Sequence, residues 1–132
     1  MEYTRYTVAI GMRFKDNLYL SRRVKTPNFD GKWQFAGGKL EEEENPLDGA
    51  IRELKEETNL APHPGRFLYV GPVKGDPTTE TCYIYYVNLH TGEVPVRTEN
   101  GMTDWKIFSF EEALKLDLMP GLKDAIHKMR NL

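Results

Sequence analysis

The feature that most constrains the fold of this chain is a helix-forming segment with three carboxylates close together. Glu53, Glu56 and Glu57 fall within five positions, and residues spaced i, i+3 and i+4 share one face of a helix. Like charges at this spacing cost an isolated helix about 0.2–0.5 kcal/mol per pair. Hard divalent cations such as Mg²⁺ bind oxygen ligands of this kind and accompany phosphate substrates. The segment therefore predicts a helix whose acidic face meets a cation.

Local signals define where this helix begins and ends. Asn45 is a good N-cap, and Pro46 suits the first helical position. Asn59 favours a left-handed stop, and Pro62 and Pro64 prevent the helix from resuming. One apolar stripe follows the helix and comprises Leu47, Ala50, Ile51, Leu54 and Thr58. The carboxylates lie beside this stripe, so we expect the helix to bury one side and present the carboxylates to a cleft.

The rest of the chain reads as strands followed by helices. Apolar runs predict strands at residues 7–13, 17–22, 33–35, 67–73, 81–89 and 105–108. The third strand leads into Gly37 and Gly38, which we expect to lie in a loop, and residues 90–103 form a polar loop. A capping box at Ser109 predicts a helix to about residue 116, and a last helix covers residues 120–130. This order predicts the α/β class, with helices on both faces of a mixed sheet.

Length and composition favour one domain over residues 1–132. The net charge of −2 offers no basic face for stable nucleic-acid binding. No apolar run approaches the length of a membrane-spanning helix, and the N-terminus lacks a secretory signal pattern, so we expect a cytoplasmic protein. Cys82 is the only cysteine and is interpreted as a buried structural thiol within a strand. The three histidines show no zinc-ligand spacing.

Residues 38–60 resemble the signature of the Nudix hydrolase family, in which a glycine and a glutamate precede an Arg-Glu-apolar-x-Glu-Glu helix. The matching residues are Gly38, Glu44, Arg52, Glu53, Leu54, Glu56, Glu57 and Leu60. Asn59 stands where the family usually has glycine, and asparagine is the next-best residue for a left-handed helix end. The resemblance implies the Nudix fold, an α/β/α sandwich around a mixed β-sheet.

The resemblance also implies metal-dependent hydrolysis of a pyrophosphate bond in a nucleoside diphosphate derivative. In that reaction Glu53 and Glu57 are the expected direct ligands of Mg²⁺ or Mn²⁺, and Glu56 is a ligand or the base that orients water. The backbone carbonyl of Gly38, or of Gly37 beside it, is a further candidate ligand.

Other residues of the signature and the later loop are expected to assist. Arg52 is expected to pair with the signature's carboxylates, and Glu44 to orient the ligands. Glu99 lies six residues before a tryptophan, at the spacing where the MutT-like branch has a loop carboxylate. It is therefore a candidate ligand or general base, although a solvated loop acid fits equally well. Glu80 and Glu93 are weaker candidates for the same role.

The chain most resembles the short MutT-like branch, which hydrolyses nucleoside triphosphates to monophosphates and pyrophosphate. Arg23 and Lys39 are candidate phosphate contacts, although exposed surface charges fit as well. Phe35, Tyr83 and Tyr85 are candidates for stacking on a base, although ordinary core aromatics have the same pattern.

The identity of the substrate stays open at this stage. Met119 and Pro120 fall near the place where the branch member that senses oxidised guanine has a base-reading asparagine, and residues 117–121 contain none. This argues against an oxidised guanine but not against triphosphate hydrolysis. The alternatives are ADP-ribose, to which Pro77 points, a dinucleoside polyphosphate, a nucleotide sugar, or nucleotide binding without turnover. We expect a small nucleotide as the partner, no membrane, and a monomer or homodimer.

Overall fold

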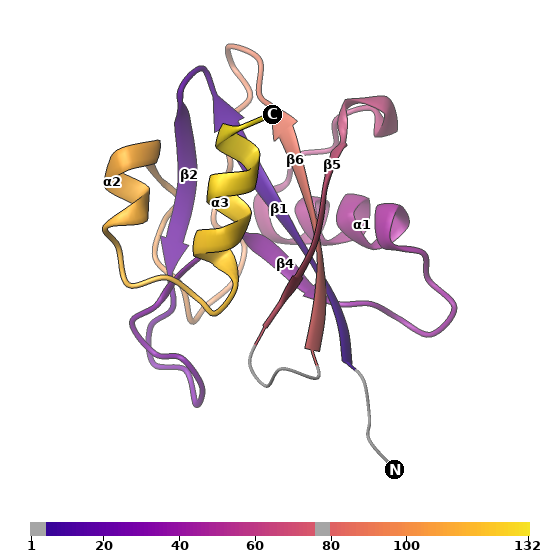
Figure 1. The fold of residues 1–132 in the computed structure, drawn as a ribbon, viewed down its shortest axis with the longest axis horizontal. Helices are drawn as coiled ribbons and strands as arrows, with labels where there is room; N and C mark the ends of the chain where they lie inside the picture. Colours follow the sequence, from indigo (N-terminus) through magenta and orange to yellow (C-terminus); the bar gives the residue numbers. More distant parts are fainter. Residues whose placement is uncertain (1–4, 76–79) are drawn as a thin grey trace.

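The computed structural model describes residues 5–75 and 80–132 (Figure 1). The strands within these residues are β1 (Arg5–Phe14), β2 (Asn17–Arg22), β3 (Trp33–Gln34), β4 (Ala36–Lys39), β5 (Leu68–Lys74), β6 (Glu80–Asn88) and β7 (Lys106–Ser109). The helices are α1 (Pro46–Thr58), α2 (Phe110–Leu114) and α3 (Leu122–Arg130), with a 3₁₀ turn, η1, at Pro64–Arg66.

The strands form one mixed sheet around β1. The order across the sheet is β3-β2-β1-β6-β5, while β4 also pairs with β1 and β7 pairs with β2. Strand β1 runs parallel to β6 and antiparallel to β2 and β4. The parallel pair is the longest in the sheet, joining residues 5–13 to residues 80–88. Because β1 contacts three strands, it holds the sheet together.

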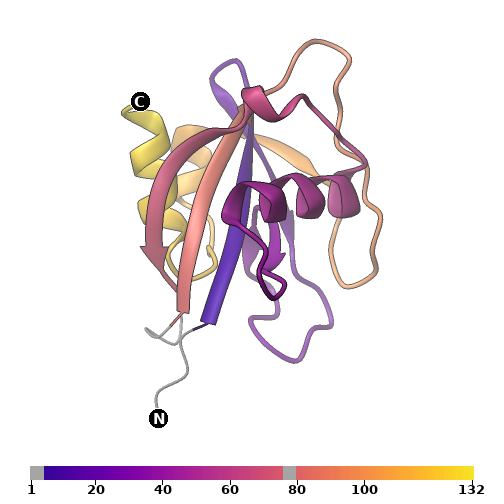
Figure 2. The same ribbon diagram turned by 90° about the vertical axis from the view of Figure 1, so that its right-hand side faces the viewer.

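Helices cover both faces of this sheet, as the sequence predicts. Figure 2 shows α1 on one side and α2 with α3 on the other. Two separate apolar cores follow from this arrangement. Leu54 of α1 packs with Ile10 and Met12 of β1, whereas Ile126 of α3 packs with Ile84 of β6. The expected α/β class is therefore confirmed.

The signals at the ends of α1 act as predicted. The side chain of Asn45 accepts a hydrogen bond of 2.9 Å from the amide of Asp48, and Pro46 begins the helix. Asn59 adopts a left-handed conformation at φ 65°, which ends the helix. The position of the carboxylates along the chain is thus determined by local chemistry.

The structure differs from the sequence expectation at the two glycines. Gly37 and Gly38 lie in β4, paired with Ala9 and Val8 of β1, and not in a loop. A Cβ on Gly37 would collide with the backbone of Val8, so only glycine permits this close pairing. The last helix begins at Leu122, slightly later than predicted, which leaves residues 119–121 in a turn.

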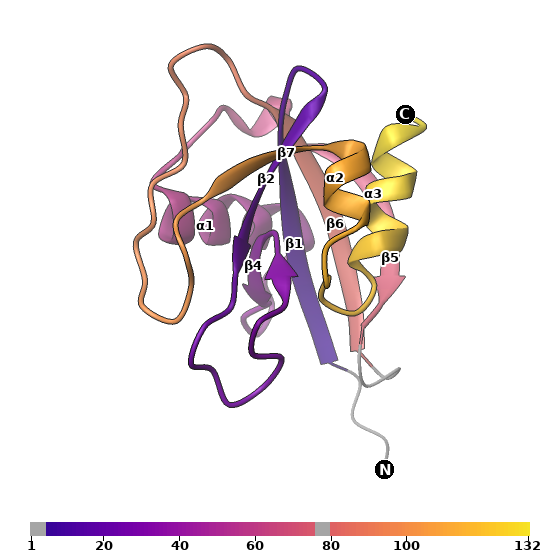
Figure 3. The ribbon, with the colours of Figure 1, turned by 90° about the vertical axis from the view of Figure 1, so that its left-hand side faces the viewer.

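The long loop between β6 and β7 runs beside the C-terminal end of α1, as Figure 3 shows. No helix among residues 5–75 and 80–132 has the length and apolar character that crossing a bilayer requires.

Candidate active site

The acidic face of α1 packs directly on the backbone of β4. The side chains of Glu53 and Glu57 are buried, at 9% and 8% exposure. The amide of Gly37 donates a hydrogen bond of 2.5 Å to Oε1 of Glu57. A Cβ on Gly38 would lie 2.5 Å from Oε1 of Glu53. The two carboxylates therefore occupy space that the glycines leave free, instead of projecting openly into a cleft as expected.

Arg52 connects the carboxylates of the signature. Its guanidinium donates two hydrogen bonds to Glu44, at 2.9 and 2.8 Å, and one of 2.9 Å to Glu53. It also contacts Glu56 at 3.3 Å and donates to the carbonyl of Lys39 at 3.1 Å. The hydrogen bonds from Arg52 lower the pKa of Glu44 to about 2. Arg52 thus links α1 to the segment that precedes it.

The single charge of Arg52 does not compensate the buried carboxylates. Burial raises the pKa of Glu57 to about 8, against the opposing effect of the Gly37 amide, and the negative charges of Glu99, Glu53 and Glu56 raise it further. Burial also raises the pKa of Glu53, in spite of Arg52. The site concentrates negative charge where water cannot solvate it well, and it would be stabilised by a bound cation.

The C-terminal end of α1 positions the loop that carries Glu99. The last four carbonyls of a helix lack partners within the helix. Here the hydroxyl of Thr98 donates to the Glu56 carbonyl at 2.5 Å, and the indole of Trp105 donates to the Glu57 carbonyl at 3.3 Å. The amide of Val96 donates to the Thr58 carbonyl at 3.0 Å. These bonds hold exposed Glu99 close enough for its charge to act on the buried carboxylates.

Sequence analysis did not identify Thr98 and Trp105 as positioning residues. The only available signal was indirect, because a helix that ends sharply at an asparagine leaves open carbonyls for a later segment to satisfy. The donors come from residues 96–105, and the sequence offered no way to choose them.

The carboxylates are the type of ligand that a hard divalent cation prefers, but their positions do not form an assembled metal site. Within residues 5–75 and 80–132, no three His, Cys, Asp or Glu side chains form an assembled metal site. Arg52 and the Gly37 amide hold these side chains in their present positions. The donors of Glu53, Glu56 and Glu57 are all oxygen atoms, and two of the carboxylates are buried. Mg²⁺ and Mn²⁺ prefer such ligands.

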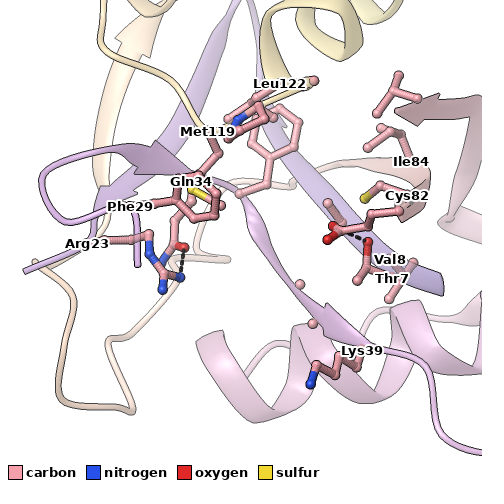
Figure 4. Close-up of a pocket in the computed structure, with 18 of the residues that line it drawn as sticks. Thr7, Val8, Arg23, Phe29, Gln34, Lys39, Cys82, Ile84, Met119 and Leu122 are labelled. Atoms are coloured by element: carbon pink, nitrogen blue, oxygen red, sulfur yellow. Dashed lines mark hydrogen bonds between the residues drawn. The ribbon is translucent and has the colours of Figure 1, made fainter. Parts of the chain in front are cut away.

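A cavity of about 260 Å³ lies beside the carboxylates. Its lining includes Gly37, Gly38 and Lys39 of β4, so one strand borders both the cavity and the acidic face of α1. Figure 4 shows Arg23 and Gln34 on one side and Thr7 on the other.

The structure places several of the candidate substrate contacts in this cavity. Arg23 is fixed there by hydrogen bonds of 3.2 Å to the carbonyl of Asn28 and to the side chain of Gln34. Phe35, Lys39, Met119 and Pro120 also line the cavity. The fold therefore brings the candidates Arg23, Phe35 and Lys39 to one cavity, together with the Met119-Pro120 segment.

Tyr83 and Tyr85 lie elsewhere, which differs from the expectation. Tyr83 stacks on Tyr6 with ring centroids 6.1 Å apart, and both Tyr83 and Tyr85 pack against the core beneath α1. Alternate residues of a strand point to opposite faces, so the neighbours Cys82 and Ile84 line the cavity instead. Burial raises the pKa of the Cys82 thiol to about 11, which agrees with a structural role.

The two weaker acidic candidates, Glu80 and Glu93, lie in different parts of the structure. Glu93 accepts hydrogen bonds from Arg66, which lower its pKa to about 2. Glu80 lines the cavity, where it accepts a hydrogen bond from Thr7. Pro77 lies outside the described residues.

The fold and the site together define a class of protein: a mixed sheet between helices, with a carboxylate-bearing helix packed on a glycine strand beside a cavity. The NUDIX domain model matches residues 3–129, so the chain belongs to the NUDIX domain family.

The chain is similar to two enzymes named 8-oxo-dGTP diphosphatase. It is 38% identical to that of Proteus vulgaris over 45 residues, 34% of this chain and 40% of the relative. It is 33% identical to that of Escherichia coli (strain K12) over 57 residues, 42% of this chain and 44% of the relative. The matched regions span less than half the length of these relatives.

Solved structures share the whole fold. A MutT NUDIX hydrolase from Burkholderia pseudomallei superimposes with a TM-score of 0.82 at 20% identity, covering 96% of this chain and 98% of the other. The NUDIX domain of Shewanella oneidensis NrtR, solved with ADP ribose, gives 0.81 at 18% identity, covering 99% of this chain and 89% of the other. These matches agree with the predicted Nudix fold.

Proposed function

We propose that this protein hydrolyses a pyrophosphate bond in a nucleoside diphosphate derivative, and that its preferred substrate is a nucleoside or deoxynucleoside triphosphate. The observation that carries the proposal is the burial of Glu53 and Glu57 against Gly37 and Gly38, at the edge of a cavity. Buried carboxylates without enough nearby positive charge favour the binding of a cation. A cation bound at the edge of a cavity in turn attracts an anionic substrate such as a phosphate ester. The products would be a nucleoside monophosphate and pyrophosphate.

The residues that would hold the divalent cation are Glu53, Glu56 and Glu57, with a backbone carbonyl of the glycine pair. Mg²⁺ or Mn²⁺, when bound, supplies positive charge against the phosphate oxygens and makes an attacking water more acidic. One structural neighbour, a bifunctional enzyme from Francisella tularensis, was solved with AMP and a manganese ion.

The side chains around these carboxylates have distinct proposed tasks. Arg52 holds Glu53 and Glu44 in fixed positions, and the Gly37 amide holds Glu57. Glu99 is exposed on its loop and is therefore free to accept a proton from water. Its alternative task is that of a further ligand.

The cavity is proposed to receive the nucleoside. Lys39 at its rim and Arg23 in its wall supply positive charge for an anionic ligand. Phe35 is almost completely buried, and it lines the cavity with aromatic atoms that a base can contact. Pockets for drug-sized ligands have volumes of ~300–1,000 Å³, and this one measures about 260 Å³. Its small size favours one nucleoside over a dinucleotide.

A screen of phosphate products tests this proposal. Purified protein is incubated with Mg²⁺ or Mn²⁺ and with nucleoside triphosphates, ADP-ribose, dinucleoside polyphosphates and nucleotide sugars. We expect monophosphate and pyrophosphate from triphosphates. Turnover of ADP-ribose or dinucleotides alone would overturn the proposed substrate class but keep the site. Failure to turn over any compound with either metal would favour a nucleotide-binding protein without catalysis.

A further inference from the structure

One carboxylate in the cavity is not used by the proposed reaction. Glu80 begins β6, and residues 80, 82 and 84 of that strand all line the cavity. This follows from the two-residue period of a strand, which directs alternate side chains to one face. On the neighbouring β1, Thr7, Val8 and Ala9 line the same cavity. Glu80 is thus placed in the floor of the cavity by the regular geometry of two paired strands.

The hydrogen bond between Thr7 and Glu80 makes this part of the cavity an acceptor surface. The hydroxyl of Thr7 donates to Oε1 of Glu80 at 3.2 Å. A hydroxyl has one proton, so this bond leaves Thr7 with acceptor lone pairs only. An ionised carboxylate has about four acceptor positions and no donor, and among residues 5–75 and 80–132 the hydroxyl of Thr7 occupies one of them. Thr7 and Glu80 together therefore recognise hydrogen-bond donors.

The position of Glu80 is restricted on its other side. A Cβ on Gly75 would lie 2.9 Å from Oε1 of Glu80, and the Gly75 amide donates to the Glu80 carbonyl at 3.2 Å. The carboxylate is half-buried between Gly75 and Thr7. A side chain confined in this way loses little further freedom when it binds a ligand.

The charge of Glu80 also determines which part of a nucleotide can lie beside it. A carboxylate repels phosphate groups, which carry negative charge. Of the positive side chains of the cavity, Figure 4 shows Arg23 on the side opposite Thr7, whereas Lys39 is the residue of β4 that pairs with Thr7 of β1. The uncharged base of a nucleotide is therefore the part that suits Glu80.

We propose that Glu80 and Thr7 select nucleotides whose base carries an exocyclic amino group. An amino group donates to the carboxylate, whereas a carbonyl at the same place would set one acceptor against another. Losing such a contact leaves a half-buried acceptor facing the ligand without a donor, which is costly. This inference rests on the proposed function, because it assumes that the cavity holds the base.

Two pairs of substrates test this preference because each pair differs at one amino group. dGTP and dITP differ in the 2-amino group of the purine, and dCTP and dUTP differ in having an amino group or a carbonyl at position 4. We expect kcat/KM to favour the amino member of at least one pair by about fivefold to a hundredfold. A ratio near one in both pairs would overturn the proposal.

Variants separate recognition from a structural role. Glu80→Gln keeps the shape of the side chain but adds a donor, so we expect the ratio within the preferred pair to fall towards one. Glu111→Gln makes the same chemical change on the exposed surface of α2 and should leave the ratio unchanged. If Glu80→Gln lowers kcat/KM equally for both members of the pair, Glu80 has only a structural role and the proposal is wrong.

A binding measurement distinguishes this proposal from the proposed reaction. The affinities of dGMP against dIMP, and of dCMP against dUMP, are measured by calorimetry with a chelator present. A preference for the amino member that Glu80→Gln removes would support the inference even if no triphosphate is hydrolysed. Equal affinities within both pairs, or no binding of any of the four, would overturn it.

Discussion

Among individual residues, Glu57 shows most clearly how burial and function conflict. The residue is 8% exposed, and burial raises the pKa of its carboxyl group to about 8. A folded-state pKa above the unfolded value of 4.5 means that ionising Glu57 destabilises the metal-free fold as the pH rises from about 4.5 through about 8. Unfavourable burial of this kind is typical of functional sites.

Replacing Glu57 with glutamine tests its proposed role. The amide keeps the size of the side chain and an oxygen that can accept from the Gly37 amide. We expect kcat with Mg²⁺ to fall by about 100-fold or more, because a charged ligand is lost. The melting temperature of the metal-free protein at pH 9 should not fall, since a buried charge is removed. A near-normal kcat in this variant would show that Glu57 is not a ligand of the catalytic cation.

At the scale of elements, β4 has two functions that depend on its lack of side chains. Gly37 pairs closely with β1, and Gly38 leaves space for the carboxylate of Glu53. The obstacles to a new methyl group differ at the two positions. At Gly37 they are backbone atoms, which cannot move without disrupting the sheet, and at Gly38 they are the end of a side chain.

The two glycine-to-alanine variants should therefore have different effects. Gly37→Ala should lower the free energy of unfolding by about 1–3 kcal/mol, because the backbone of β1 must shift. Gly38→Ala should displace Glu53 and lower kcat by about tenfold or more, while the free energy of unfolding changes by less than about 1 kcal/mol. Denaturant unfolding and steady-state kinetics measure both quantities. Equal loss of stability in the two variants would contradict this distinction.

An ion pair between Arg66 and Glu93 joins η1 to the loop after β6, where Arg66 also donates to the carbonyl of Asn88 at 2.8 Å. Arg66 donates to Glu93 at 2.9 Å and lowers its pKa to about 2, below the unfolded value of 4.5. A lowered pKa contributes stability above pH 4.5 that is lost as the pH falls through about 2.

Glu93→Gln measures this contribution. We expect the variant to be less stable than the wild type by about 1 kcal/mol at pH 7, a value reduced by solvent screening. The difference should shrink at pH 3 and vanish near pH 2. Urea unfolding of both proteins at each pH gives the difference, with Glu42→Gln, at an exposed position, as a control. A difference that does not change with pH would show that the ion pair is not its source.

At the scale of the whole molecule, the sheet separates two cores that support two parts of the site. The core under α1 fixes the carboxylates, and the core under α3 lies behind the cavity. Met129 of α3 is fully buried, and a Cβ on Gly11 would meet both Met129 at 2.9 Å and Phe35 at 3.1 Å. Met129 therefore lies close to an aromatic residue that lines the cavity.

Met129→Ala should affect stability and ligand binding together. The cavity that it creates should lower the free energy of unfolding by about 2–5 kcal/mol, and KM should rise because Phe35 loses support. Lys123→Ala, at an exposed position of the same helix, should change stability by less than about 0.5 kcal/mol. Thermal unfolding and kinetics measure these effects. An unchanged KM in a folded Met129→Ala protein would show that the packing of Met129 does not affect ligand binding in the cavity.

The parts of the fold that could be predicted from sequence depend on local chemistry. Asn45, Pro46 and Asn59 mark the ends of α1 through hydrogen bonds and backbone conformations close to their own positions. The alternation of apolar residues gave the main strands within a few residues of their observed ends. The carboxylate triplet and the neighbouring Arg52 were visible because they lie within one short segment.

Residues that meet across the fold could not be found in this way. The hydrogen bond between Thr7 and Glu80 joins residues 73 positions apart, and that from Trp105 to the Glu57 carbonyl joins residues 48 positions apart. Sequence analysis left open whether Tyr83 stacks on a base or packs in the core, because it could not tell which face of β6 lies towards α3. A shift of one residue in strand register reverses the faces of every side chain.

The α/β class, the ends of α1 and the residues of its acidic face follow from the sequence alone, because they depend on propensities and hydrogen bonds within a few residues. The position of β4 against that face, the burial of Glu53 and Glu57, and the orientation of Glu80 towards the cavity become known only from the folded chain. These properties depend on which strands pair and in what register, and pairing is determined by the packing of the whole chain around its two cores.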